Sequence, residues 1–148
     1  MKNRLRIIVL TAFGMVLVGS TPCFAQDENA VKNPIDVAQA KCLKKTHATM
    51  PRAKCYSVAS EAWQNKVEVT YAAVLKKLSP QLKKTLEAGQ AAWQKYQEEE
   101  ENLIANLYPG RGTGYISVRI IEIMKAYKDR ALELESHLQT IKDSQAEN

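Results

Sequence analysis

The stretch LEAGQAAWQKY, residues 86–96, decides the fold of this 148-residue chain. The residues that recur in it at helical spacing are Leu86, Gln90, Trp93 and Tyr96. On a helix of about 3.6 residues per turn they share one face. Gln90 on that face needs hydrogen-bond partners, because an unpaired buried amide costs roughly 1–3 kcal/mol. We expect Trp93 and Tyr96 to anchor the core, Gln90 to bond a neighbouring backbone, and the other helices to cover this face.

The same periodicity predicts a helix from about Pro80 to Leu107, followed by a loop. Its apolar face comprises Leu82, Leu86, Gly89, Trp93, Tyr96, Leu103 and Leu107. Six polar residues interrupt this face, from Gln97 to Asn102. Such a run is usually a solvated helix surface, yet here it crosses a face that is apolar before and after it. The loop is residues 108–114, with three glycines and a proline in seven residues.

The chain on either side of this region also shows helical spacing. A fourth helix is predicted from Tyr115 to Ile141, with Lys125, Lys128 and Arg130 on its polar side. Its apolar stripe is Ile116, Ile120, Ile123, Tyr127, Ala131, Leu134, Leu138 and Ile141. On the N-terminal side, a long amphipathic helix is predicted over residues 52–78. Its apolar positions are Cys55, Ala59, Trp63, Val67, Tyr71, Val74 and Leu78.

Prolines mark the remaining helix boundaries. Asn33-Pro34 indicates the start of a short helix over about residues 35–45, because proline suits the first helical position. Thr49-Met50-Pro51 breaks that helix, and Ser79-Pro80 marks a cap and a restart. No strand pattern competes. The predicted fold is therefore an all-α, single-domain antiparallel bundle of one short and three long helices.

The first 25 residues have the pattern of a cleaved signal peptide. Three basic residues, Lys2, Arg4 and Arg6, precede an apolar run over residues 7–18 and a small-residue segment that ends at Ala25. The apolar run is shorter than the roughly 20 residues that span a membrane. We therefore expect a soluble, periplasmic or secreted protein without a membrane span after cleavage. Its predicted parts are a flexible segment at 26–34, a helical domain at 35–141 and a disordered tail at 142–148.

Removal of this segment changes the charge balance. The whole chain carries 21 basic and 16 acidic residues, and loss of the three basic residues leaves a net charge of +2 instead of +5. A nucleic-acid-binding function then loses its main support. Two cysteines remain, Cys42 and Cys55, and in an exported chain they predict one disulfide. A metal site has only His47 and His137 to add to them, which is too few, so we expect no metal and no cofactor.

No motif indicates catalysis, and we expect this protein not to be an enzyme. The glycine-rich loop lacks the Gly-Lys-Ser/Thr that a phosphate-binding loop needs. There is neither a Ser/His/Asp arrangement nor a His-Glu-x-x-His motif. The run Glu98, Glu99, Glu100 and Glu101 would point in four directions on a helix, so it is not a positioned acid/base pair.

The order of these residues resembles the N-terminal domain of the LprI-like lysozyme inhibitors, over nearly the whole chain after residue 25. The matching positions are Cys42, Met50, Cys55, Tyr71, Leu86, Gln90, Trp93, Tyr96, Arg130 and Leu134. The Gln-x-x-Trp-x-x-Tyr core after a cysteine pair carries most of this resemblance. It implies an exported helical protein of the cell envelope whose activity is lysozyme inhibition.

This chain departs from the pattern of that family at four positions. Family members follow the Trp-x-x-Tyr motif with Arg-Asp and a cysteine, which pairs with a cysteine eight residues before the later arginine. Here those positions are Gln97, Glu98, Glu101 and Glu122. Both cysteines are missing together, as expected when a disulfide is lost as a unit.

Two functional hypotheses follow. In the first, the protein inhibits lysozyme by presenting the loop Tyr108–Tyr115, with Arg111 at its centre, and the acidic run from Glu98 to Glu101. Lysozyme has two carboxylates in its cleft, which Arg111 could approach, and a surface that is commonly basic, which the acidic run could attract. In the second, the protein is a non-inhibitory interaction module whose partner is another envelope protein.

Overall fold

The computed structural model describes residues 33–107 and 112–146, which form four α-helices and no strand. The helices are α1 (Pro34–Leu43), α2 (Thr49–Lys77), α3 (Pro80–Leu107) and α4 (Gly112–Ala146). This is the all-α arrangement of one short and three long helices that the periodicity predicts. Residues 1–32 lie outside the described part, and with them the predicted signal peptide and most of the flexible segment at 26–34.

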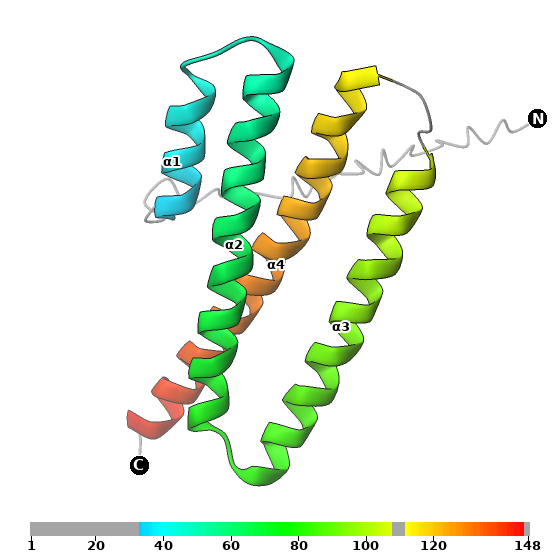
Figure 1. The fold of residues 1–148 in the computed structure, drawn as a ribbon. Coiled ribbons are helices and arrows are strands. Elements are labelled where there is room, and N and C mark those ends of the chain that lie inside the picture. The colour runs from blue at the N-terminus through cyan, green and yellow to red at the C-terminus, as the bar shows by residue number, and fades with distance from the viewer. Residues whose placement is uncertain (1–32, 108–111, 147–148) are drawn as a thin grey trace, which may run out of the picture. The chain divides into compact units, whose positions relative to one another are not determined.

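Successive helices run antiparallel, as short connections require (Figure 1). The closest packing, however, is between α2 and α4, which run in the same direction and cross each other. Helix α1 packs beside the N-terminal half of α2, and α3 packs more sparsely against α4. The α2–α4 pair is therefore the centre of the bundle, and α1 and α3 lie on either side of it.

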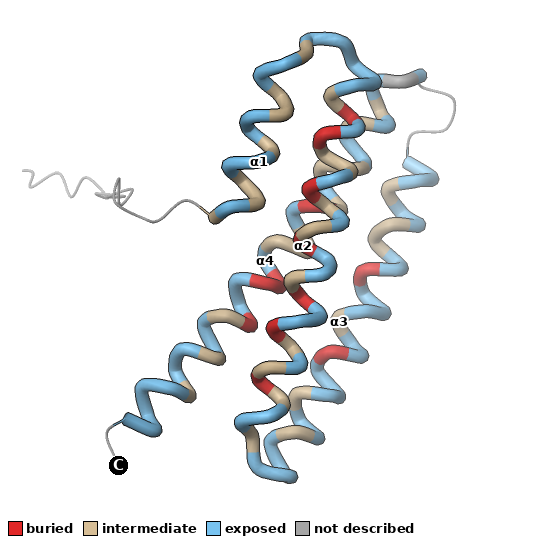
Figure 2. The backbone as a smooth tube through the Cα atoms, turned by 60° about the vertical axis from the view of Figure 1, so that its left-hand side comes forward, coloured by how far each residue is buried: buried red, intermediate tan, exposed pale blue. Residues whose placement is uncertain are grey.

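The core lies along the line where α2 crosses α4, and most of its residues come from α2 (Figure 2). Trp63 is fully buried, with 0% of its surface exposed. The residues that pack around it from the two helices are Ala59, Val67, Met124, Ala131 and Leu134. Alanine at two of these positions, Ala59 and Ala131, leaves room for the indole ring between the two helices.

The expectation that Tyr96 anchors the core was wrong, whereas Trp93 does pack against the core but is not one of its fully buried residues. Trp93 is half-buried at the edge of the core, and Tyr96 is 58% exposed. Other residues of the predicted α3 stripe are also about half exposed: Leu82, Leu103 and Leu107. The physical reason is the sparse contact of α3 with α4, which covers only part of the apolar face that α3 carries.

Three helix boundaries differ from those predicted. The break before α2 lies at residues 44–48, so Thr49 and Pro51 belong to its first turn, where proline is tolerated. Helix α4 begins at Gly112 (φ +70°, a backbone conformation that favours glycine), so only residues 108–111 separate α3 from α4. Residues 142–146, predicted as a disordered tail, continue α4 to Ala146.

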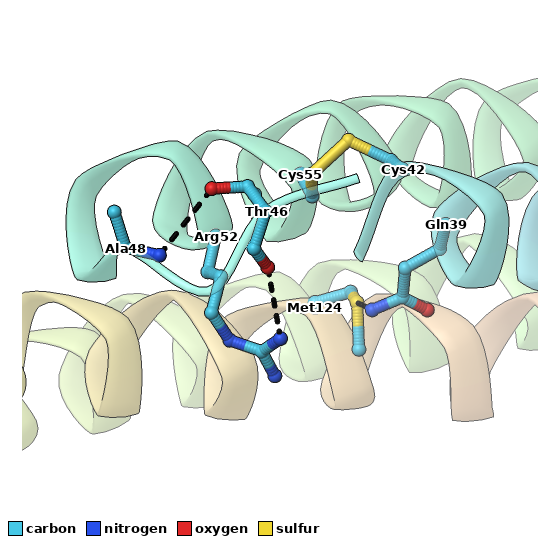
Figure 3. Close-up of a disulfide and its surroundings, with 7 residues drawn as sticks. All are labelled: Gln39, Cys42, Thr46, Ala48, Arg52, Cys55 and Met124. Atoms are coloured by element: carbon cyan, nitrogen blue, oxygen red, sulfur yellow. Dashed lines mark hydrogen bonds between the residues drawn. A yellow bond between two sulfur atoms is a disulfide. The ribbon is translucent and has the colours of Figure 1, made fainter. Parts of the chain in front are cut away.

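The disulfide between Cys42 and Cys55 is confirmed and joins the end of α1 to the first turns of α2 (Figure 3). Their Cα atoms are 5.8 Å apart. The turn between the helices is held by Thr46, whose Oγ1 accepts a hydrogen bond from the Ala48 N–H at 3.3 Å. Helix α1 is also held to α4, because Lys128 Nζ pairs with Asp36 at 2.8 Å. None of the described helices is both long and apolar enough to cross a membrane.

Candidate functional site

The most specific polar contact in the bundle joins Gln90 of α3 to Arg130 of α4. The Arg130 Nε and Nη2 groups both donate to Gln90 Oε1, at 3.0 and 2.8 Å. Gln90 is 6% exposed and Arg130 is 8% exposed. The expectation that Gln90 bonds a neighbouring backbone was therefore wrong, because its partner is a side chain forty residues later in the chain.

A buried arginine is tolerated only where its charge and its N–H groups have partners. Here Arg130 Nη1 also donates to Glu133 Oε2 at 2.7 Å, one turn further along α4. The guanidinium lies over the Trp93 ring, with its Cζ atom 5.7 Å from the ring centroid. Periodicity places Arg130 on the polar side of its helix, whereas the structure buries it under α3, where these groups surround it.

Two aromatic residues extend this contact. The rings of Trp93 and Tyr127 meet edge to face, with centroids 5.6 Å apart. Tyr71 of α2 packs against the same core, as does Leu86. Of the six positions predicted as the motif core, the structure thus brings five together at the junction of α2, α3 and α4. Tyr96 is the exception and faces solvent.

A groove lies beside this junction, between α2 and α3 with α4 as its floor. We call it the α2–α3 groove. It consists of two hollows of about 330 and 390 Å³ that share Gln64, Glu101 and Tyr127. The first hollow reaches Trp93 and Gln90, so the groove opens directly onto the motif residues. In the second, the floor is formed by Ile120 and Ile123 of α4.

The described charged residues that line the α2–α3 groove are all acidic: Glu61, Glu68, Glu98 and Glu101. Among the described residues, none of these carboxylates forms an ion pair with a basic side chain. Burial raises the pKa of the Tyr127 phenol, and the nearby charges of Glu101 and Glu68 raise it further. The acidic side chains of the groove thus disfavour a further negative charge on Tyr127.

Gln97 also lines this groove, and the sequence analysis noted it only as a departure from the family pattern and not as a functional candidate. It is 6% exposed. Its carboxamide makes no hydrogen bond to another described residue. The spacing of Gln90, Gln94, Gln97 and Glu101 by four, three and four residues places them on one helical face, and this signal could have identified the polar wall.

The predicted contact residues for a partner are only partly brought together. Glu98 and Glu101 both line the α2–α3 groove, whereas Glu99 is exposed and does not. Tyr115 belongs to the first turn of α4, and Tyr108 and Arg111 lie outside the described residues.

The two glutamates at the positions of the family's second cysteine pair line the same hollow. Glu101 of α3 and Glu122 of α4 line one hollow of about 230 Å³ between these helices. This is where a second disulfide would join α3 to α4. The lack of a second disulfide at this position is consistent with the sparse packing between α3 and α4.

Among the described residues, no group of three or more His, Cys, Asp and Glu is arranged to hold a metal ion. A separate hollow of about 310 Å³ lies beside the disulfide between α1 and α2 and has an almost wholly apolar lining. It contains no carboxylate and none of the aromatic motif residues. The α2–α3 groove is therefore the candidate site.

Comparison with known proteins gives a family and a fold. A family model described as "Lysozyme inhibitor LprI" matches residues 40–134, which is more than half of the chain. No curated protein matches. Among solved structures, a putative uncharacterized protein from Burkholderia thailandensis is similar, with a TM-score of 0.71 and 23% sequence identity. The similarity covers 77% of this chain and 58% of that protein, so this chain spans little more than half of its relative's length.

Proposed function

The chain belongs to the LprI lysozyme inhibitor family, and on this premise we propose that it binds lysozyme and blocks its activity. The family match carries this proposal, because it includes α2, α3 and the part of α4 that holds Arg130. The buried contact of Gln90 with Arg130 lies within the matched region and supports a rigid helical scaffold. We also propose that residues 1–25 are removed on export to the periplasm or the exterior, which suits the Cys42–Cys55 disulfide.

The contact surface that we propose is the acidic run of α3 with the adjoining segment at 108–115. Glu98 and Glu99 are exposed and Glu100 and Glu101 are half-buried, so this part of α3 carries four carboxylates within about one turn. Such a patch raises the rate of association with a basic enzyme more than it raises the affinity. Arg111 would supply the complementary contact to the carboxylates of the lysozyme cleft.

The test adds increasing amounts of the disulfide-bonded chain to lysozyme. The remaining lysozyme activity is measured as the loss of turbidity of a cell-wall suspension. We expect inhibition by the unmodified chain. A variant with Gln at all four positions from Glu98 to Glu101 should bind more slowly, and the difference from the unmodified chain should shrink at high salt. Glu87→Gln is the single-charge control, because Glu87 is exposed on the same helix and lies outside the groove.

Two further outcomes separate the alternatives. Arg111→Ala should weaken inhibition even at physiological salt, since a cleft contact is screened less than a surface charge. If both variants inhibit as well as the unmodified chain, this surface is not the one that contacts lysozyme. Binding of lysozyme without inhibition would instead favour the second hypothesis, a non-inhibitory interaction module of the envelope.

A further inference from the structure

We propose that the α2–α3 groove is a binding site for a peptide segment that bears arginine or lysine side chains. The groove shares Glu98 and Glu101 with the proposed lysozyme contact, but its other wall is formed by Gln64, Glu61 and Glu68 of α2, which that contact does not use. The inference does not depend on lysozyme as the partner, because it follows from the charge, the hydrogen-bonding groups and the shape of the groove itself.

The charge of the groove selects a cationic ligand. Its described charged lining consists of four carboxylates, from α2 (Glu61 and Glu68) and from α3 (Glu98 and Glu101). Two half-buried lysines of the bundle pair with carboxylates outside the groove. Lys66 pairs with Glu135 at 2.6 Å, and Lys128 pairs with Asp36 on the α1 side. The carboxylates of the groove are thus left for a cation from outside, and a carboxylate holds a guanidinium or ammonium by charge-assisted hydrogen bonds.

The uncharged lining selects a peptide over a simple cation. Gln97 is more than nine-tenths buried, lines the groove, and has a carboxamide without a partner among the described residues. The amide atoms of Gln97 are not among the fully buried polar atoms, so the amide reaches open space and is available to hydrogen-bond a ligand. Gln64 and Gln94 line the same hollow. A carboxamide has both a donor and an acceptor, and so it can complement the N–H and C=O groups of a peptide backbone.

The shape fits an extended ligand with cationic side chains. The two hollows meet at Gln64, Glu101 and Tyr127, so the groove is longer than either hollow alone. Its floor changes along its length from the aromatic Trp93 and Tyr127 to the aliphatic Ile120 and Ile123. Aromatic faces attract guanidinium groups, and aliphatic surface accommodates the methylene stems of arginine and lysine.

The experiment measures binding of a tetra-arginine peptide, acetylated and amidated at its ends, to the disulfide-bonded full chain. Calorimetry gives the affinity at 0.15 M salt, about physiological ionic strength. Because Trp93 lines the groove and Trp63 is fully buried, ligand binding should also change the tryptophan emission through Trp93. A tetra-serine peptide with the same end groups should not bind.

The double variant Glu68→Gln with Glu101→Gln should lower the affinity for the tetra-arginine peptide by about tenfold or more, as expected for the loss of two charge-assisted contacts. Glu87→Gln with Glu99→Gln is the matched control, because it removes the same charge from exposed α3 positions outside the groove. Gln97→Leu keeps a side chain of similar volume and removes the amide, and it should also lower the affinity for the peptide. Circular dichroism verifies that each variant retains its helices.

Three results would overturn the proposal. The first is no binding of the tetra-arginine peptide to the unmodified chain. The second is an equal loss in the matched control pair, which would show non-specific attraction to acidic residues. The third is binding of spermidine, a cation without a peptide backbone, as tight as that of the peptide. Lysozyme takes no part in these measurements, so they stand or fall separately from the proposed inhibition.

Discussion

The contact between Gln90 and Arg130 is expected to be the largest polar contribution to the stability of the bundle, and replacing Gln90 by Leu tests this. The change keeps a side chain of similar size and removes the Oε1 atom that accepts two hydrogen bonds, at 3.0 and 2.8 Å. Hydrogen bonds to charged groups contribute about 1.5–3 kcal/mol each, and the two here share one acceptor. The guanidinium stays 8% exposed with two donors unpaired. We expect a loss of about 3 kcal/mol in the free energy of unfolding.

A double-mutant cycle isolates this contact from the packing around it. Arg130→Met alone should cost about 2 kcal/mol, because it leaves the Gln90 amide buried without its partner. The double variant has neither the charge nor the amide, so its loss should be smaller than the sum of the two single losses by about 2 kcal/mol. Gln94→Leu is the control on the same helix, because Gln94 is exposed, and it should change the stability by less than about 0.5 kcal/mol.

The assay is urea unfolding at neutral pH, followed by helical circular dichroism under conditions that keep the disulfide oxidised. The midpoint should shift while the slope with urea stays the same, which shows a change in stability alone. Two results would refute the reasoning. One is additivity of the single losses within about 0.5 kcal/mol, which would mean that the two side chains do not act together. The other is an equal loss from Gln94→Leu.

Three further predictions concern other parts of the bundle. Trp63→Ala should cost about 3–5 kcal/mol, because the ring is fully buried, and a loss under about 1 kcal/mol in urea unfolding would contradict the assignment of the core. Replacing Cys42 and Cys55 by Ala should cost about 3 kcal/mol in the chain-entropy model, and adding reductant to the unmodified chain should give the same shift of the urea midpoint. The raised pKa of Tyr127 means that the unfolded chain loses this proton first, so stability should fall as pH rises above about 10. Glu101→Gln should lower that pKa, as measured by the ultraviolet absorbance of the phenolate, and an unchanged titration would show that the carboxylate does not act on Tyr127.

Much of the fold could be predicted because local rules decide it. Proline and the N-cap position mark the start of α1, where the Asn33 side chain accepts a hydrogen bond from the Ile35 N–H at 3.0 Å. The three- and four-residue spacing of apolar residues predicted α2 through Trp63 and Val74, and these residues are buried. The pairing of Cys42 with Cys55 followed from their number and from the compartment.

The candidate site was only partly predictable. The spacing of Gln90 and Trp93 marked the right helix face, but sequence spacing cannot show which side chain of another helix meets it. Periodicity assigned Arg130 to the polar side of its helix, because it lies outside the apolar stripe. Its burial depends on Gln90 and Glu133, which surround the guanidinium only after α3 and α4 have packed.

The sequence by itself determined the helices, their order and the disulfide, because these depend on contacts between residues that are near one another in the chain. Only the tertiary structure decided which apolar stripe becomes the core. Trp63 and Trp93 both lie on regularly spaced apolar faces, and the crossing of α2 with α4 buries the first completely and leaves the second at the edge. The α2–α3 groove likewise exists only because three helices meet. Its carboxylates come from separate turns of α2 and α3. They line one groove only because the two helices lie side by side, and no local sequence pattern encodes that arrangement.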